Sequence, residues 1–508
     1  MKRILSLITG MALVAAILTG CGGNKPQESA SQGGGSPASK DSVVMALSGD
    51  ISNLNPWDNT VLIDRFVRTN YYETLLDMDG TEFVPLLAED YSISDSGTEY
   101  TFMLKKGVKF HNGDELTAED VVYSIEQARL SSSFSAETAA IEKVEAVDDY
   151  TVKVTLSEVN APFLLSVAAK VCITNKEYME ANGEAAINAP IGTGPYRFVS
   201  REAGSKITME AFEDWHGGEV AIKNAEFRVV ADSSAAVMSL EAGDIDLTYT
   251  LPTISVAQLQ ENPNMTVSMV PTQGSAYLVY NINNAPFDDL NFRKAISYSV
   301  DRDTIISAAL DGIGMKSVSM WGPTTVGYTG NYTFPEYDIE KAKEYLAQSN
   351  YNGETIQFIV GNDTYKRSAV ILQNEWAKLG INVEIVQMES NAWISDMKNG
   401  NYQLSLVIHT VEPDADLWST RFASTGIGIS NMSHVQRDDI DELFLQGRST
   451  TNMDERCGYY DEIMKILVDE AIVVPIYYRT MTPAYNANLV VDRFETSGYA
   501  RVVYMHWK

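Results

Sequence analysis

The sequence predicts an α/β fold with two or three domains. Over most of its 508 residues, short runs rich in β-branched and aromatic residues alternate with segments whose apolar residues recur at helical spacing. Near residue 375 a segment with helical spacing is followed directly by one with strand-like alternation, which is a clear example of a helix–strand unit. No segment recurs at a fixed period, so a repeat architecture is not indicated.

The first twenty residues have the pattern of a secretory signal. Lys2 and Arg3 precede an apolar stretch over residues 4–18, which is too short and too interrupted to span a bilayer comfortably. The stretch leads into Leu-Thr-Gly-Cys, ending at Cys21, which resembles the bacterial lipobox, whose cysteine becomes diacylated. We therefore predict a signal peptide over residues 1–20 and a lipid anchor at Cys21. The alternative is a plain signal peptide with an incidental cysteine.

A flexible tether is predicted over residues 21–42. From residue 22 onward this segment is rich in Gly, Ser, Gln, Asn and Pro and has almost no apolar side chains. It cannot bury enough surface to offset its chain entropy. Two acyl chains on a cysteine suffice for stable anchoring, so a lipidated end and a tether form a coherent leader for a surface protein.

Two helices are predicted from their first residues. Thr117 is a favourable N-cap, and Asp120 three residues later resembles a reciprocal capping box. Asp338 is the N-cap of another helix, in which Ala342 and Leu346 face inward.

A third helix is predicted from its spacing and its end. Leu372 and Trp376 keep helical spacing, and Gly380 stands where a glycine ends a helix. The alternation over residues 381–385 then predicts a strand.

Composition narrows the class of protein. The chain is 45% hydrophobic and 21% charged, which is ordinary for a globular protein. With 38 basic and 68 acidic residues its net charge is −30, which repels nucleic acid and anionic lipid. This charge favours cationic ligands or, more simply, keeps an extracellular protein soluble.

No metal or catalytic motif is evident. Cys172 and Cys457 stand alone without CxxC spacing, so they are either two free thiols or one disulfide. The histidines show no HxxxH spacing, and neither GxSxG nor HExxH is present. We predict no catalytic residue, no metal site and no cofactor.

Several motifs follow one another along the body of the chain. They are Thr74-Leu75-Leu76 with Pro85-Leu86-Leu87-Ala88-Glu89; residues 100–121, YTFMLKKGVKFHNGDELTAEDV; Gly192-Thr193-Gly194-Pro195-Tyr196; Gly243-Asp244-Ile245-Asp246; and residues 281–289 followed by Arg293-Lys294-Ala295 and Asp301-Arg302. In this order and behind a lipobox, they resemble the motifs of family 5 of the extracellular solute-binding proteins, the peptide/nickel group that serves ABC importers. The resemblance runs from Val43 to the C-terminus.

The resemblance implies a two-lobed α/β clamshell of the periplasmic-binding-protein type II kind, with an extra third domain as in cluster C. Carried over, the domains are lobe I at residues 43–75, 190–275 and 485–508, the extra domain at residues 76–189, and lobe II at residues 276–484. Solute would bind between the lobes and hinge closure would bury it.

The resemblance also implies the partners and the location. The ligand would be a peptide or a related small solute, delivered to an ABC permease and its ATPase. The protein would be a monomer without nucleic-acid partners, lipid-anchored at the extracellular face of the cytoplasmic membrane or facing the periplasm.

A solute cleft needs aromatic walls and a few aimed polar groups. Five tryptophans lie in loop-like contexts, and Trp215 among them is expected to be structural. The other four are candidates for such walls: Trp57, Trp321, Trp393 and Trp418. Tyr277 and Asn281 complete the predicted set outside the segment discussed next.

The most informative segment is residues 402–421. In peptide-binding relatives this strand and loop line the cleft, and an aspartate four residues before a proline pairs with the peptide ammonium group. His409 occupies that position here. Three nearby acids are alternative partners: Glu412, Asp414 and Asp416. Otherwise the ligand lacks a free ammonium group. Three roles are open for His409 itself: it donates a hydrogen bond to an anion, binds a metal complex, or has its hydrogen bonds satisfied within the fold.

Other function classes stay open beside peptide import. The same fold could serve a nickel chelate, an opine, a sugar or a signalling peptide. A wall-polymer hydrolase is a remote alternative, since paired carboxylates could mimic a glycosidase dyad.

Overall fold

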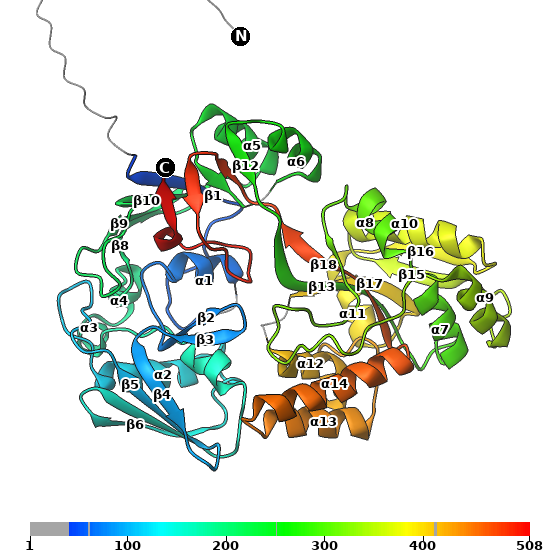
Figure 1. Cartoon of the computed structure of the whole chain (residues 1–508), viewed down its shortest axis with the longest axis horizontal. Helices are drawn as coiled ribbons and strands as arrows, with labels where there is room; N and C mark the ends of the chain where they lie inside the picture. The colour runs from blue at the N-terminus through cyan, green and yellow to red at the C-terminus, as the bar shows by residue number, and fades with distance from the viewer. Residues whose placement is uncertain (1–39, 59–60, 250, 411–413) are drawn as a thin grey trace, which may run out of the picture. The chain divides into compact units, whose positions relative to one another are not determined.

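The computed structural model describes residues 40–58, 61–249, 251–410 and 414–508 (Figure 1). Within these ranges the fold is α/β, as predicted, and it rests on three sheets of four or more strands. The predicted signal peptide, Cys21 and Glu412 lie outside the described residues, as does all but the end of the tether. Ser42, the last residue of that tether, already begins strand β1.

A seven-stranded sheet combines segments from both ends of the chain. Its order is β12 (Met265–Val267), β19 (Ala484–Asn486), β11 (Leu247–Thr248), β1 (Ser42–Leu47), β10 (Asn224–Val229), β9 (Lys206–Ala211) and β8 (Tyr196–Glu202). Strand β1 pairs in parallel with β10 and β11. The associated helices are α1 (Leu62–Arg68), α5 (Ser233–Ala242) and α6 (Thr253–Gln260).

A four-stranded antiparallel sheet has its own hydrophobic core. Its order is β4 (Ala88–Ile93), β5 (Glu99–Leu104), β7 (Thr151–Leu156) and β6 (Ile141–Asp148). Helix α2 (Ala118–Leu130) packs on it, and the predicted capping box of Thr117 and Asp120 is present. Short elements surround this core: β2 (Leu76–Asp79), β3 (Glu82–Pro85), η1 (Leu164–Ala168), α3 (Lys176–Asn182) and α4 (Glu184–Asn188).

A six-stranded mixed sheet spans the second half of the chain. Its order is β14 (Met315–Lys316), β18 (Val473–Met481), β13 (Val270–Tyr280), β17 (Leu404–Thr410), β15 (Ile356–Val360) and β16 (Val383–Gln387). The α-helices of this half are α7 (Leu290–Tyr298), α8 (Arg302–Ala309), α9 (Ile339–Gln348), α10 (Asp363–Ala377), α11 (Ser390–Lys398), α12 (Ser419–Phe422), α13 (Asp438–Arg448) and α14 (Met453–Asp469). Short pieces complete the chain: η2 (Ala415–Trp418), η3 (Ser424–Gly426), η4 (Val502–Tyr504), β20 (Leu489–Val491) and β21 (Met505–Trp507).

Strand β13 is buried on both faces and therefore supplies two cores. Because successive side chains point to opposite faces, Tyr277 and Val279 join a cluster that contains Trp418. Ala276 and Leu278 join the cluster on the other face, which contains Trp376.

The predicted helix ends are confirmed. The Asp338 side chain accepts a hydrogen bond from the Lys341 amide at 3.0 Å and so caps α9. Gly380 lies at φ +78° just beyond α10, where residues with a Cβ are disfavoured. The strand that follows begins at Val383 rather than at residue 381. No helix of the described residues is long and apolar enough to cross a bilayer.

The predicted domain boundaries stay a prediction. The four-stranded sheet lies within residues 76–189, and the strands of the seven-stranded sheet fall in segments assigned to lobe I, except that β1 begins at residue 42 and β19 at residue 484. Strand β13, however, begins in the segment assigned to lobe I and ends in the segment assigned to lobe II. Both Cys172 and Cys457 are free thiols.

Candidate functional site

Two neighbouring strands place Ser275, Tyr277 and His409 on one face of the six-stranded sheet. Ser275 on β13 lies directly opposite His409 on β17, so their side chains share a face. The rings of Tyr277 and His409 are 5.8 Å apart between centroids. The sheet register thus brings a hydroxyl, an imidazole and a phenol together near the end of β17.

Aromatic residues form the floor beside this group. Trp418, on η2, lies 6.4 Å from Tyr277 and 6.3 Å from Trp321 between ring centroids. Phe422, one helical turn after Trp418, stacks on it at 6.0 Å. All four rings are almost fully buried, so they fix the shape of the site.

Helix α12 adds Arg421, whose guanidinium charge acts on both His409 and Tyr277. Three polar atoms of this group are buried without a hydrogen-bond partner among the described residues: Ser275 Oγ, His409 Nε2 and Arg421 Nε. A buried polar group without a partner costs about 1–3 kcal/mol, which a ligand that forms hydrogen bonds to these atoms would recover.

The charges of the group are set by burial. Burial, reinforced by the charge of Arg421, lowers the pKa of His409 to about 3, so its ring is neutral at physiological pH. Burial also lowers the pKa of Arg421, which still carries its positive charge. We name Ser275, Tyr277, His409 and Arg421 the β13–β17 cluster. It is a neutral-to-positive site on a strongly acidic protein.

Asp414 and Asp416, two acids predicted as alternative partners for a ligand, are engaged elsewhere. Both oxygens of Asp414 accept hydrogen bonds from Arg456 Nη2, at 2.9 and 3.1 Å. Asp416 Oδ2 accepts one from Arg448 Nε at 3.0 Å. Burial raises the pKa of Asp416 to about 6, against the opposing charge of Arg448. The two arginines belong to α13 and α14, so these carboxylates hold the 414–418 loop to that helix pair.

Three other predicted residues have partners of their own outside the cluster. Trp57 packs edge-on against Tyr123 in the core of the four-stranded sheet, with ring centroids 6.1 Å apart. Trp393 is buried and its Nε1 donates to Ser405 Oγ at 2.9 Å. Asn281 donates to the Gly400 carbonyl at 3.0 Å. It lies six residues beyond Ser275, or about 20 Å along extended chain.

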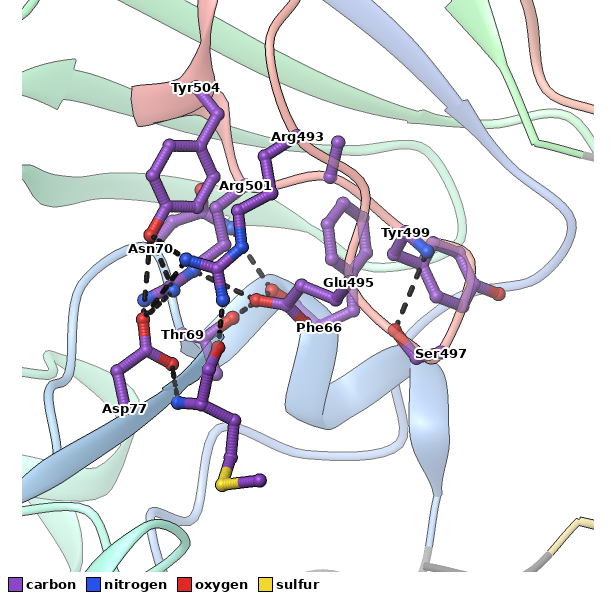
Figure 2. Close-up of polar contacts among 12 residues, drawn as sticks. Phe66, Thr69, Asn70, Asp77, Arg493, Glu495, Ser497, Tyr499, Arg501 and Tyr504 are labelled. Atoms are coloured by element: carbon purple, nitrogen blue, oxygen red, sulfur yellow. Dashed lines mark hydrogen bonds and ion pairs between the residues drawn. The ribbon is translucent and has the colours of Figure 1, made fainter. Parts of the chain in front are cut away.

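A cavity of about 430 Å³ opens beside the first residues of β13. Figure 2 shows the polar network at its wall. Arg501 forms ion pairs with Asp77 and, at 2.8 Å, with Glu495, while its Nη2 also donates to Tyr504 Oη at 2.8 Å. Arg493 joins the network from the same C-terminal segment. These charges satisfy one another, so the network fastens the C-terminal segment to β2.

The sequence interpretation missed Ser275 and Arg421. No local sequence motif distinguishes either residue as a site residue. Ser275 lies in a strand of ordinary composition, and Arg421 resembles the arginines that are common on protein surfaces. The cavity residues Asp77, Arg493 and Arg501 were missed for the same reason. No cluster of three or more metal-ligating side chains occurs in the described ranges.

Three sheets of four or more strands, combined with helices, place the protein in the α/β class. The family description "Bacterial extracellular solute-binding proteins, family 5 Middle" matches residues 82–428, and the chain belongs to this family. It is 30% identical to Heme-binding protein A of Haemophilus influenzae, over 78% of this chain and 79% of that protein. It is also 30% identical to Di/tripeptide-binding protein 1 of Pseudomonas aeruginosa, over 80% of this chain and 83% of that protein. The solved structure of HbpA2 from Haemophilus parasuis shares the fold, with a TM-score of 0.84 and 24% identity over 92% of this chain and 100% of that one. The predicted family and fold class are thereby confirmed.

Proposed function

We propose that this protein is the lipid-anchored, solute-capturing component of an ABC importer, and that it binds a small polar solute such as a short peptide without changing it. The observation that carries the proposal is the β13–β17 cluster, where buried polar atoms without partners lie over an aromatic floor. Such a combination is what a small-molecule site requires. The names of two relatives, a di/tripeptide-binding protein and a heme-binding protein, support a small-molecule or short-peptide ligand.

Membership of this family supports the proposed location and partners. The protein would act as a monomer at the extracellular face of the cytoplasmic membrane, held by Cys21, and would deliver solute to a permease and its ATPase. Its net charge of −30 argues against nucleic acid as a partner.

Binding without turnover is tested by calorimetry of the purified protein against a library of di- and tripeptides. We expect saturable binding of one peptide per chain, with the recovered peptide intact by mass spectrometry. Cleaved peptide would overturn the binding-only function. Binding of sugars, opines or metal chelates in place of every peptide would overturn the peptide assignment and leave the importer role.

The anchor is tested separately in cells fed a labelled fatty acid. The wild-type protein should take up the label and sediment with membranes, whereas Cys21→Ser should do neither. Equal labelling of the variant would show that Cys21 is not the lipidated residue.

A further inference from the structure

We propose that the β13–β17 cluster receives an anionic group of the solute, a carboxylate or another oxyanion, and not an ammonium group. The inference rests on the proposed function, because it takes the cluster as part of the solute site. It goes further by naming the charge of the group that binds there.

The first step is the charge of the cluster. Arg421 carries the permanent charge, and its Nε can only donate a hydrogen bond. His409 is neutral, so its ring adds no net charge to the cluster and does not cancel the charge of Arg421. A ligand group with negative charge and several acceptor oxygens is therefore complementary to the cluster.

The second step is the set of orphaned atoms. Ser275 Oγ and His409 Nε2 can each donate, and Arg421 Nε must donate. One carboxylate has enough lone pairs to accept from all three. An ammonium group would instead present further donors to Arg421 and would be repelled by its charge.

The third step is that, among the described residues, no unpaired acidic side chain acts on the cluster. Arg421 is the charged group that acts on His409, and Tyr277 is the titratable group that acts on Arg421. Asp414 and Asp416 are engaged with Arg456 and Arg448. An ammonium group bound here would lack a counter-charge from either aspartate.

The test uses four forms of one peptide, namely free, N-acetylated, C-amidated and doubly blocked. Trialanine is the first probe, replaced by the tightest peptide of the library if trialanine does not bind. Calorimetry of the wild-type protein should show that amidation weakens binding by about tenfold or more, while acetylation changes it by less than about threefold.

Variants then assign the effect to the cluster. Arg421→Gln should bind the free acid and the amide equally, and Arg421→Lys, which keeps the charge, should retain part of the preference. His409→Asp should reverse the pattern, so that acetylation now weakens binding. Arg197→Gln is the matched control, since Arg197 pairs with Glu210 in the seven-stranded sheet and should leave the preference unchanged.

The outcomes separate the two proposals. Tight peptide binding that is lost on acetylation and kept on amidation would overturn the anion site and leave the proposed function standing. Equal binding of all four forms would do the same. If no peptide binds at all, the peptide function fails, and the anion site fails with it.

Discussion

Asp414 and Arg456 form a buried ion pair in which one arginine nitrogen donates to both carboxylate oxygens, at 2.9 and 3.1 Å. Both side chains are about 97% buried or more. Arg456 Nε also donates to the Gly447 carbonyl, and its Nη2 donates to Tyr460 Oη as well. The pair therefore joins the 414–418 loop, which carries Trp418, to α14.

We expect Asp414→Asn to lower the free energy of unfolding by about 3–5 kcal/mol, because it leaves the charge of Arg456 buried without its counter-charge. Urea unfolding followed by circular dichroism measures this. Asp439→Asn, which breaks a half-exposed pair with Arg437, is the matched control and should cost less than about 1 kcal/mol. Equal losses in the two variants would contradict the assigned role of Asp414.

The raised pKa of Asp416 predicts that the free energy of unfolding depends on pH. Its pKa is raised from 3.8 to about 6 in the folded protein, so the folded state binds a proton between these values that the unfolded state does not. Relative to Asp416→Asn, the wild-type protein should therefore gain about 2 kcal/mol of stability as the pH falls from 7 to 4.5. Unfolding curves of both proteins at several pH values measure the difference. A difference that is independent of pH would rule out the raised pKa.

Local signals explain why much of the fold could be predicted. The capping box at Thr117 and the glycine at position 380 act through neighbouring residues, and each is visible in the sequence. The alternation of apolar residues in β17 is equally local. The family motifs, found in their usual order, predicted the overall fold to which these elements belong.

The partners of the site residues are not local. Asp414 finds Arg456 42 residues further along the chain, and His409 meets Ser275 through the register of two antiparallel strands. Arg421, on α12 beyond η2, carries a charge that acts on His409. Sequence alone therefore identified His409 as a departure from the family pattern and could not show which charge surrounds it.

Gly192 is predicted to tolerate no side chain. A Cβ at this position would lie 1.9 Å from the carbonyl oxygen of Tyr71 and 2.8 Å from the ring of Tyr72, and the Tyr71 contact is with backbone, which cannot turn aside as a flexible side chain can. We expect Gly192→Ala to destabilise the protein by about 3 kcal/mol, which thermal unfolding would measure. Gly458→Ala is the control, because nothing lies within 4 Å of its added Cβ and the residue is helical. That variant should be neutral or more stable by up to about 1 kcal/mol.

Trp418 should report solute binding through its fluorescence, because its ring adjoins Tyr277 in the cluster. Titration of the wild-type protein with a bound peptide should change the tryptophan emission, and Trp418→Phe should remove most of that change. Trp507→Phe is the control, since this half-buried residue of β21 donates to the Ser42 carbonyl in the seven-stranded sheet. An unchanged signal in Trp418→Phe would place the solute away from this floor.

His409 is expected to stay neutral over the whole physiological range. Its pKa is lowered from 6.5 to about 3, so the folded state loses its proton well below the pH at which the unfolded state does. The contribution of this group to stability is therefore complete above about pH 6.5 and is lost as the pH falls toward 3. In proton NMR spectra, the ring signal that disappears in His409→Gln should not shift between pH 8 and pH 5. A midpoint near pH 6.5 for that signal would show that the ring is not buried beside Arg421.

An anionic solute bound at the cluster would raise the pKa of His409, because it would bring a negative charge beside the imidazole. The titration repeated with saturating peptide should then show the signal shifting at a higher pH than in the free protein.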